Sequence, residues 1–391
     1  MRSSRIGITT NGRSFKKMKK MEIRETELFY CIALTQIKGL GPVSIRQLVG
    51  RVGSARALFE MVENPGDDSL SLGAFPIECI RKQRDSAFRV SENEMRLIEK
   101  HNVRTLIMGD EEYPYRLMQC PDAPLVLYAY GGCSLNLPRM LALVGSRRAT
   151  GYGLGQTEKM VSSLAEIAPC VVSGMAYGID TRAHASALAC NLPTVAVLGN
   201  GLGTIYPYSN KKLFEQIREN GLILTEFLFE SASDAFHFPL RNRIIAGISD
   251  AVVVMEAKRR SGALITADLA FSYSREVFAC PGRMTDEMSE GCNLLVAQNK
   301  ALLLTSPRDV VEHMGWDGGA NLPLFSNAAP LPEMDEDEQK LYGFLQTLST
   351  PDIDTLYENS GLSLPDLKSL LLSMECKGLI KSLSGNRFCC I

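Results

Sequence analysis

The sequence predicts an α/β protein with a doubly wound, mainly parallel sheet, and three observations support this fold class. First, short apolar segments recur through the middle of the chain, at residues 140–145, 170–174, 194–199, 222–227, 250–257, 276–280 and 301–304. Second, most of them are separated by a stretch long enough for a helix, which is typical of parallel strands joined by right-handed crossovers. Third, Asp250–Met255 contains an uninterrupted β-branched run, as expected of a strand that is buried on both faces.

The other segments divide the chain into further predicted regions. Residues 1–21 are basic, and we expect a disordered arm there unless translation begins at Met18 or Met21. Residues 22–102 are expected to form a small helical domain, SAM-like or helix-hairpin-helix-like, in which Gly39–Pro42 joins two apolar helices. Such a turn can hold a phosphate with its glycine amides, but a tight turn without a ligand is the favoured explanation.

The sheet occupies residues 103–314, and residues 315–334 form a linker rich in proline and small residues. Residues 335–391 contain three helical runs and a hairpin, the pattern of a winged helix. The third run carries only Lys368 and Lys377 as cations, and the domain begins with an acidic run. Regulation or protein contact is therefore at least as well supported there as binding of duplex DNA in the major groove.

Composition and charge narrow the class of protein. A chain of 391 residues with 45% hydrophobic and 22% charged residues is typical of a soluble globular protein. The N-terminal residues contain no apolar run long enough for a signal peptide or a membrane span, so we expect a cytoplasmic protein without a membrane partner. The eleven cysteines form no CxxC pair and have no histidines at metal spacing, which predicts reduced thiols, no metal and no cofactor.

The segment Phe236–Gly282 contains many of the residues that indicate a binding function. Between Phe236 and Arg260 it has five cations, Arg241, Arg243, Lys258, Arg259 and Arg260, against two acids, Asp250 and Glu256, although the net charge of the chain is −2. Arg241, Asn242 and Arg243 begin a predicted helix, and Lys258 follows the carboxyl end of a predicted strand. Ser261 and Gly262 then open a helical run that includes Thr266. Fixed cations, helix N-termini and hydroxyl groups suit a polyanion.

Loops at other strand ends extend this predicted site. Gly145, Ser146 and Arg147 follow the first long strand, and Ser173 and Gly174 end the next. Neither junction has the GxGxxG fingerprint and acidic partner of a dinucleotide fold, and no P-loop occurs in the chain. Lys211 follows the third strand. If the winding is regular, these residues share one groove at the carboxyl edge of the sheet.

Two further patterns each have two interpretations. Phe236 and Phe238 precede the arginines and could stack on bases, although aromatics beside a helix start more often form a hydrophobic staple. Asp180 and His184 lie four residues apart and could form a general acid–base pair. Because no nucleophile or metal ligand accompanies them, a cap at Asp180 and a packed His184 are favoured, and no catalytic residue is predicted.

Five motifs, VGSRRATGYG, SGMAYGIDTRAH, FPLRNRIIAG, EAKRRSGALITA and FACPG, resemble the DprA (Smf) family of bacterial DNA-processing proteins in this order. The resemblance implies an extended Rossmann-like domain that binds and protects single-stranded DNA in transformation, loads RecA recombinase onto it and dimerises. It places the dimer contact at the end of that domain, where Leu294, Leu295 and Leu302 lie. The residues of the implied DNA site are Gly145, Ser146, Arg147, Ser173, Gly174, Lys211, Phe238, Arg241, Asn242, Arg243, Lys258, Ser261, Gly262 and Thr266.

Two alternative functions, an enzyme and a nucleotide sensor, belong to other classes of protein. Related Rossmann-like domains act as phosphoribohydrolases through a PGGxGTxxE loop, but SGALITA and CPGRMTDE lack its paired glycines and its glutamate in register. A nucleotide-sensing domain could instead signal through the C-terminal region. Only the DNA-binding hypothesis predicts a salt dependence that grows with oligonucleotide length.

Overall fold

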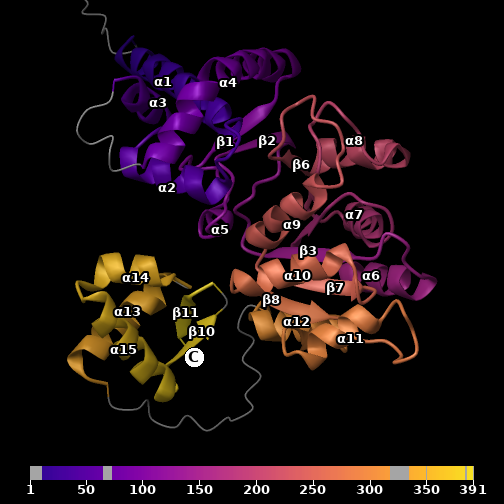
Figure 1. Ribbon diagram of the computed structural model, residues 1–391. Coiled ribbons are helices and arrows are strands. Elements are labelled where there is room, and N and C mark those ends of the chain that lie inside the picture. Colours follow the sequence, from indigo (N-terminus) through magenta and orange to yellow (C-terminus); the bar gives the residue numbers. More distant parts are fainter. Residues whose placement is uncertain (1–10, 65–72, 318–333, 349, 384, 391) are drawn as a thin grey trace, which may run out of the picture. The chain divides into compact units, whose positions relative to one another are not determined.

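The computed structural model describes residues 11–317, except 65–72, and residues 334–391, except 349, 384 and 391. In this part of the chain nine strands form one sheet in the order β1-β2-β6-β5-β4-β3-β7-β8-β9. Figure 1 labels β1, β2, β3, β6, β7 and β8 among them. The pairs β3–β4, β3–β7, β7–β8 and β8–β9 are parallel, whereas β1–β2 and β2–β6 are antiparallel. The predicted doubly wound, mainly parallel sheet is confirmed, with antiparallel strands added at one end.

The chain divides into two compact units, which we call the first unit (residues 1–136 and 196–244) and the second unit (residues 137–195 and 245–391). In this division, strands β1 and β2 and the segment 196–244 group with the N-terminal helices. The predicted domain boundary at residues 102 and 103 stays a prediction. The two units are described separately below.

The first unit begins with a helical bundle. Its elements are α1 (Asn11–Thr35), α2 (Pro42–Val52), α3 (Ala55–Glu63), α4 (Ala74–His101), β1 (Arg104–Ile107), α5 (Tyr115–Met118), β2 (Val126–Gly131), the 3-10 helix η2 (Tyr208–Asn210), α8 (Lys211–Asn220) and β6 (Leu222–Thr225). Helix α1 packs against α3 and α4 through buried residues such as Ile32 and Phe59.

Helix α1 starts at Asn11 rather than at the predicted Glu22. Lysine, arginine and methionine in residues 11–21 are good helix formers, which explains why the helix extends into the predicted arm. The rest of that arm lies outside the described residues.

Two elements fall across the division between the units: β5 (Thr194–Val197) and α9 (His237–Ile248). The second unit contains β3 (Met140–Gly145), α6 (Gly151–Ser163), β4 (Cys170–Ser173), α7 (Ile179–Ala189), β7 (Ala251–Glu256), α10 (Gly262–Ser272), β8 (Glu276–Ala279), α11 (Glu290–Ala297), β9 (Leu302–Leu303) and α12 (Pro307–Met314). Every residue of β7 is buried, as its apolar run predicts. Leu141, Val253 and Phe278 bring β3, β7 and β8 into one core cluster.

The C-terminal segment forms α13 (Glu336–Leu348), α14 (Ile353–Ser360), α15 (Leu364–Cys376), β10 (Ile380–Leu383) and β11 (Arg387–Cys390). Strands β10 and β11 pair antiparallel, and the three helices bury a core that includes Leu341, Leu356 and Leu371. Three helices followed by a hairpin confirm the predicted winged helix.

Candidate nucleic-acid interface

The loop that joins β3 to α6 presents two exposed arginines, Arg147 and Arg148. A Cβ atom on Gly145 would lie 2.6 Å from Ile179 Cγ1 and 2.9 Å from the carbonyl oxygen of Glu256, so the backbone must approach its neighbours closely there. The Ser146 hydroxyl accepts a hydrogen bond from the Arg148 amide at 3.1 Å. The predicted loop of Gly145, Ser146 and Arg147 is therefore held by the protein and carries its cations on the surface.

The buried carboxylate of Glu256, at the end of β7, fixes the far end of this loop. It accepts hydrogen bonds from the Thr150 amide at 2.8 Å and from the Thr150 hydroxyl at 2.6 Å. The Thr150 hydroxyl in turn accepts from the Gly153 amide and caps α6. Glu256 is far from this loop in the sequence, and the pairing of β3 with β7 brings it there.

The loop after β4 packs against the same segment. Gly178 has φ +74°, and a Cβ atom on it would lie 2.2 Å from the Ser146 carbonyl oxygen. The Ile179 amide donates a hydrogen bond to that oxygen at 3.2 Å. Ser173, a predicted DNA contact, is buried and donates its hydroxyl to the Leu143 carbonyl oxygen at 2.7 Å, while Gly174 is also buried. These two residues support the loop from inside the protein.

Asp180 and His184 are also inside the second unit. The N-cap of α7 is Gly178, so Asp180 is not the cap and instead accepts a hydrogen bond from the Ala176 amide at 3.3 Å. His184 is buried, and its Nδ1 lies 2.7 Å from Thr194 Oγ1. The packed histidine favoured by the sequence is what the structure contains.

The segment after β7 exposes a second group of cations, Arg259 and Arg260. Lys258 is partly exposed and pairs with Glu287 at 2.8 Å. Ser261 caps α10 by accepting a hydrogen bond from the Ala263 amide, and a Cβ atom on Gly262 would meet nothing within 4 Å. Thr266, also a predicted contact, is buried one turn further along α10.

In the first unit, the predicted contacts Arg241, Asn242 and Arg243 are buried. The Arg241 guanidinium donates to the Val197 carbonyl oxygen and, at 3.1 Å, to Asn242 Oδ1. Arg243 exposes 5% of its surface, donates to the Asp122 carbonyl oxygen and forms an ion pair with Glu226. Both arginines thus have partners within the protein rather than an open surface for DNA.

Three exposed aromatic side chains of the first unit lie between residues 206 and 236, whereas the exposed Phe75 lies far from them in the sequence, in α4. We call Tyr206, Tyr208 and Phe236, together with the exposed Lys211 and Lys212, the aromatic–lysine surface. Tyr208 and Phe236 expose 71% and 81% of their surface. The Lys211 ammonium lies 5.8 Å from the Tyr208 ring centroid.

Phe238 packs between one residue of this surface, Tyr206, and the backbone at Gly199. Its ring lies 5.7 Å from that of Tyr206, and a Cβ atom on Gly199 would lie 2.9 Å from it. Lys211 and Phe238 belong to the predicted DNA contacts, whereas Tyr208 does not. Its position three residues before Lys211, beyond any apolar run, is a signal that could have identified it.

The predicted dimer residues have different environments. Leu302 and Leu303 form the edge strand β9 among the described strands and expose 40% and 48% of their surface. Leu294 is partly exposed, whereas Leu295 is buried and therefore packs inside the protein. Only Leu302 and Leu294 of the predicted set offer surface for a contact.

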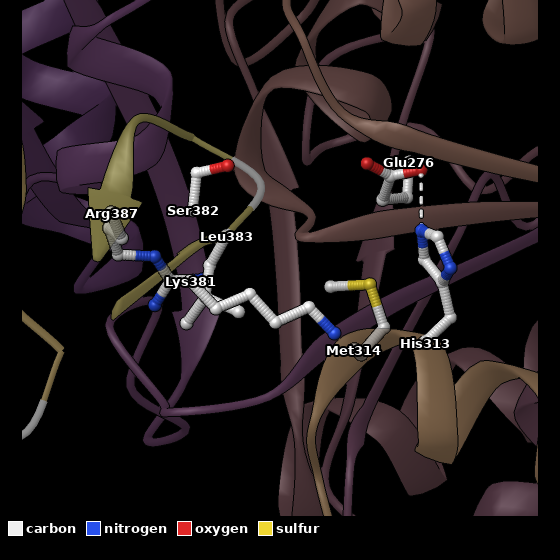
Figure 2. A pocket seen from close by; sticks show the side chains of 7 residues that line it. All are labelled: Glu276, His313, Met314, Lys381, Ser382, Leu383 and Arg387. Atoms are coloured by element: carbon white, nitrogen blue, oxygen red, sulfur yellow. Dashed lines mark ion pairs between the residues drawn. The ribbon is translucent and has the colours of Figure 1, made fainter. Parts of the chain in front are cut away.

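A pocket of about 230 Å³ in the second unit has mixed charge and includes none of the predicted DNA contacts (Figure 2). In it, His313 Nε2 lies 3.1 Å from a carboxylate oxygen of Glu276, while Lys381 and Arg387 come from β10 and β11. We do not assign this pocket to the interface. In the described ranges, no group of three or more histidine, cysteine or acidic side chains could hold a metal ion, and no helix is long and apolar enough to cross a membrane.

The fold and its loops define a Rossmann-like α/β protein that has a C-terminal winged helix and no dinucleotide fingerprint. Residues 104–315 match the family of DNA recombination-mediator protein A, and residues 326–386 match the DprA winged helix domain. The chain belongs to this DprA/Smf family of DNA-processing proteins.

Similar proteins agree with this assignment. Protein Smf of Synechocystis is 34% identical over 406 residues, covering 93% of this chain and 98% of the relative. The DNA processing protein DprA of Streptococcus pneumoniae is 44% identical over 202 residues, which cover 52% of this chain and 71% of the relative. The solved structure of S. pneumoniae DprA superposes with a TM-score of 0.63 at 33% identity, covering 73% of this chain and 97% of that one.

Proposed function

We propose that this protein binds and protects single-stranded DNA without chemical catalysis, and that it loads RecA recombinase onto the strand in natural transformation and recombination. The aromatic–lysine surface is the observation that carries the proposal. Exposed rings beside lysines suit a single strand, because unpaired bases offer their faces for stacking while lysines neutralise the backbone. In a duplex those faces are already stacked on neighbouring base pairs.

Exposed cations of the second unit provide further phosphate contacts in this proposal. Arg147 and Arg148 follow β3, and Arg259 and Arg260 follow β7, the strand that pairs with β3. The N-terminus of α10, which follows Arg259 and Arg260, adds the positive end of a helix dipole.

The buried residues have a different proposed role. Arg241, Asn242 and Arg243, together with Ser173 and Thr266, hold the loops in place and do not touch DNA directly. Their internal partners and low exposure support this revision of the predicted contact set.

We propose that the protein acts as a homodimer. The exposed leucines of the edge strand β9 would pack against their copies across a two-fold axis, since an unpaired edge with apolar side chains favours association. Membership of a recombination-mediator family supports RecA as the partner that follows on the DNA.

The experiment that tests the binding proposal is a salt titration by fluorescence anisotropy. Labelled single strands of two lengths, a duplex and a mononucleotide are compared with the full-length protein. The proposal predicts preference for the single strand and a log–log salt slope that is steeper for the longer strand. Equal affinity for strand and duplex would remove the stacking argument, and binding of the mononucleotide alone would favour a nucleotide sensor.

A further inference from the structure

Tyr177 is an exposed aromatic residue of the second unit, in the loop that joins β4 to α7. It exposes 48% of its surface, whereas every other residue from 173 to 180 is buried or partly buried. Met175 and Ile179 on either side of it are buried, and Ile179 belongs to the core cluster of this unit. The loop is therefore anchored on both sides of Tyr177, while the ring itself stays exposed.

Hydrogen bonds fix the backbone next to Tyr177. The Ala176 amide donates to Asp180 Oδ2 at 3.3 Å. The Ala176 carbonyl oxygen accepts from the Thr181 amide at 3.1 Å and from the Thr181 hydroxyl at 2.7 Å. Met175 has φ +61°, an uncommon conformation for a residue other than glycine, which persists only where the surroundings impose it. A ring on a backbone held in this way loses little conformational freedom when a ligand binds.

The exposed Arg147 lies beside this loop. A Cβ atom on Gly178 would lie 2.9 Å from the carbonyl carbon and 2.9 Å from the carbonyl oxygen of Arg147. Gly178 follows Tyr177 directly, and consecutive Cα atoms are about 3.8 Å apart, so Tyr177 and Arg147 start from neighbouring points of the surface. One exposed ring is ordinary on a protein surface, but a ring beside a cation matches the two parts of a nucleotide, its base and its phosphate.

The charge around this pair also suits a phosphate. Residues 140–157, which include Arg147 and Arg148, contain no acidic residue, and neither do residues 169–179. Asp180 and Glu256 reach these loops, but both are buried and both accept hydrogen bonds from backbone amides. The surface that the two loops expose is therefore positive, which favours an anionic ligand.

We propose that Tyr177 and Arg147 form a nucleotide subsite, in which one unpaired base stacks on the Tyr177 ring while Arg147 binds the adjacent phosphate. The occupant is a nucleotide of a bound single strand, and in this respect the inference rests on the proposed function. It gives the second unit a stacking position in addition to its phosphate contacts. A free mononucleotide has the same two parts, so the test includes one.

The test measures binding to the full-length protein by fluorescence anisotropy, with a labelled thymine oligonucleotide and an abasic oligonucleotide of the same length. Tyr177→Ala should weaken binding of the thymine strand at least about fivefold and change binding of the abasic strand less than about twofold, because only a base can stack on the ring. Arg147→Gln should weaken binding of both strands alike, because their phosphates are the same.

Two further replacements and a control separate the ring from the fold. Tyr177→Phe keeps the flat ring and should bind as the wild type does, whereas Tyr177→Leu keeps an apolar side chain without the ring and should behave as Tyr177→Ala does. Tyr357→Ala is the matched control, since Tyr357 exposes 47% of its surface but lies in α14 of the winged helix, and it should change neither affinity. Thermal melting followed by circular dichroism verifies that each variant is folded.

The outcomes distinguish this inference from the proposed function. If Tyr208→Ala weakens binding of the thymine strand while Tyr177→Ala does not, the subsite is overturned and the aromatic–lysine surface stands. An equal loss on the thymine and abasic strands would also overturn the subsite, because the effect would not depend on the bases. If no strand binds, the proposed function fails, and calorimetric titration with thymidine monophosphate decides the subsite: binding that Tyr177→Ala abolishes supports it for a free nucleotide, and no binding overturns it.

Discussion

The buried ion pair between Arg243 and Glu226 gives a prediction that distinguishes support of the fold from direct contact with DNA. The side chains of Arg243 and Glu226 expose only 6% and 14% of their surface, and burial raises the pKa of the Glu226 carboxyl while Arg243 opposes that rise. Arg243→Met would remove the ion-pair partner of the carboxylate and the hydrogen bond to the Asp122 carbonyl oxygen. Removing one member of a buried pair costs about 3–5 kcal/mol, against a net stability of about 5–15 kcal/mol for a typical domain.

Urea unfolding followed by far-UV circular dichroism measures this loss. The single tryptophan, Trp316, lies in the second unit and is a poor probe of the first. With a slope of about 1–3 kcal/mol per M, the unfolding midpoint should fall by about 1 M or more. The double variant Arg243→Met/Glu226→Leu should recover most of the loss, because it removes both charges together. The exposed Arg147→Met serves as a control that should keep the midpoint.

One result would refute this reasoning. If Arg243→Met unfolds at the wild-type midpoint while its affinity for single-stranded DNA falls tenfold with a shallower salt slope, then Arg243 contacts a phosphate directly. The original prediction from the sequence would then be correct for this residue.

Three further predictions concern exposed side chains, whose replacement should leave the fold intact. Arg147→Glu should weaken binding to single strands about tenfold and reduce the log–log salt slope by about 0.7 in anisotropy titrations; an unchanged slope would exclude a phosphate contact. Tyr208→Ala should cost about 1–3 kcal/mol of binding free energy in the same assay at an unchanged salt slope, whereas a cost that vanishes at high salt would mean that the ring does not stack. Leu302→Arg should place an unpaired charge in the proposed dimer contact and give a soluble, cooperatively melting monomer by sedimentation; a persistent dimer would move the interface elsewhere.

Much of the fold could be predicted from the sequence, because buried parallel strands leave continuous apolar runs. Strand β7 was identified in this way, whereas the antiparallel hairpin of β10 and β11 was identified from two short strand-like segments about a Ser-Gly-Asn turn. Strand β2, at Val126–Gly131, was not among the predicted strands. Its pairing with β6 is antiparallel, a relation that apolar patterning alone cannot reveal.

The candidate site was less predictable, for a physical reason. An arginine in a sequence carries the same charge whether it is exposed or buried, and burial depends on distant partners. The Asp122 carbonyl oxygen that accepts from Arg243 is 121 residues away in the chain. Arg147, by contrast, lies in a short loop fixed by local glycines, and its predicted exposure agrees with the structure.

The most direct test of the central claim, that a single strand binds by stacking on exposed aromatic rings, uses an abasic strand. A thymine oligonucleotide and an abasic oligonucleotide of the same length carry the same backbone charge but differ in their bases. The account predicts that the full-length protein binds the abasic strand at least about tenfold more weakly at every salt concentration, with the same salt slope for both. Equal affinities for the two strands would contradict it and would leave charge alone as the basis of binding.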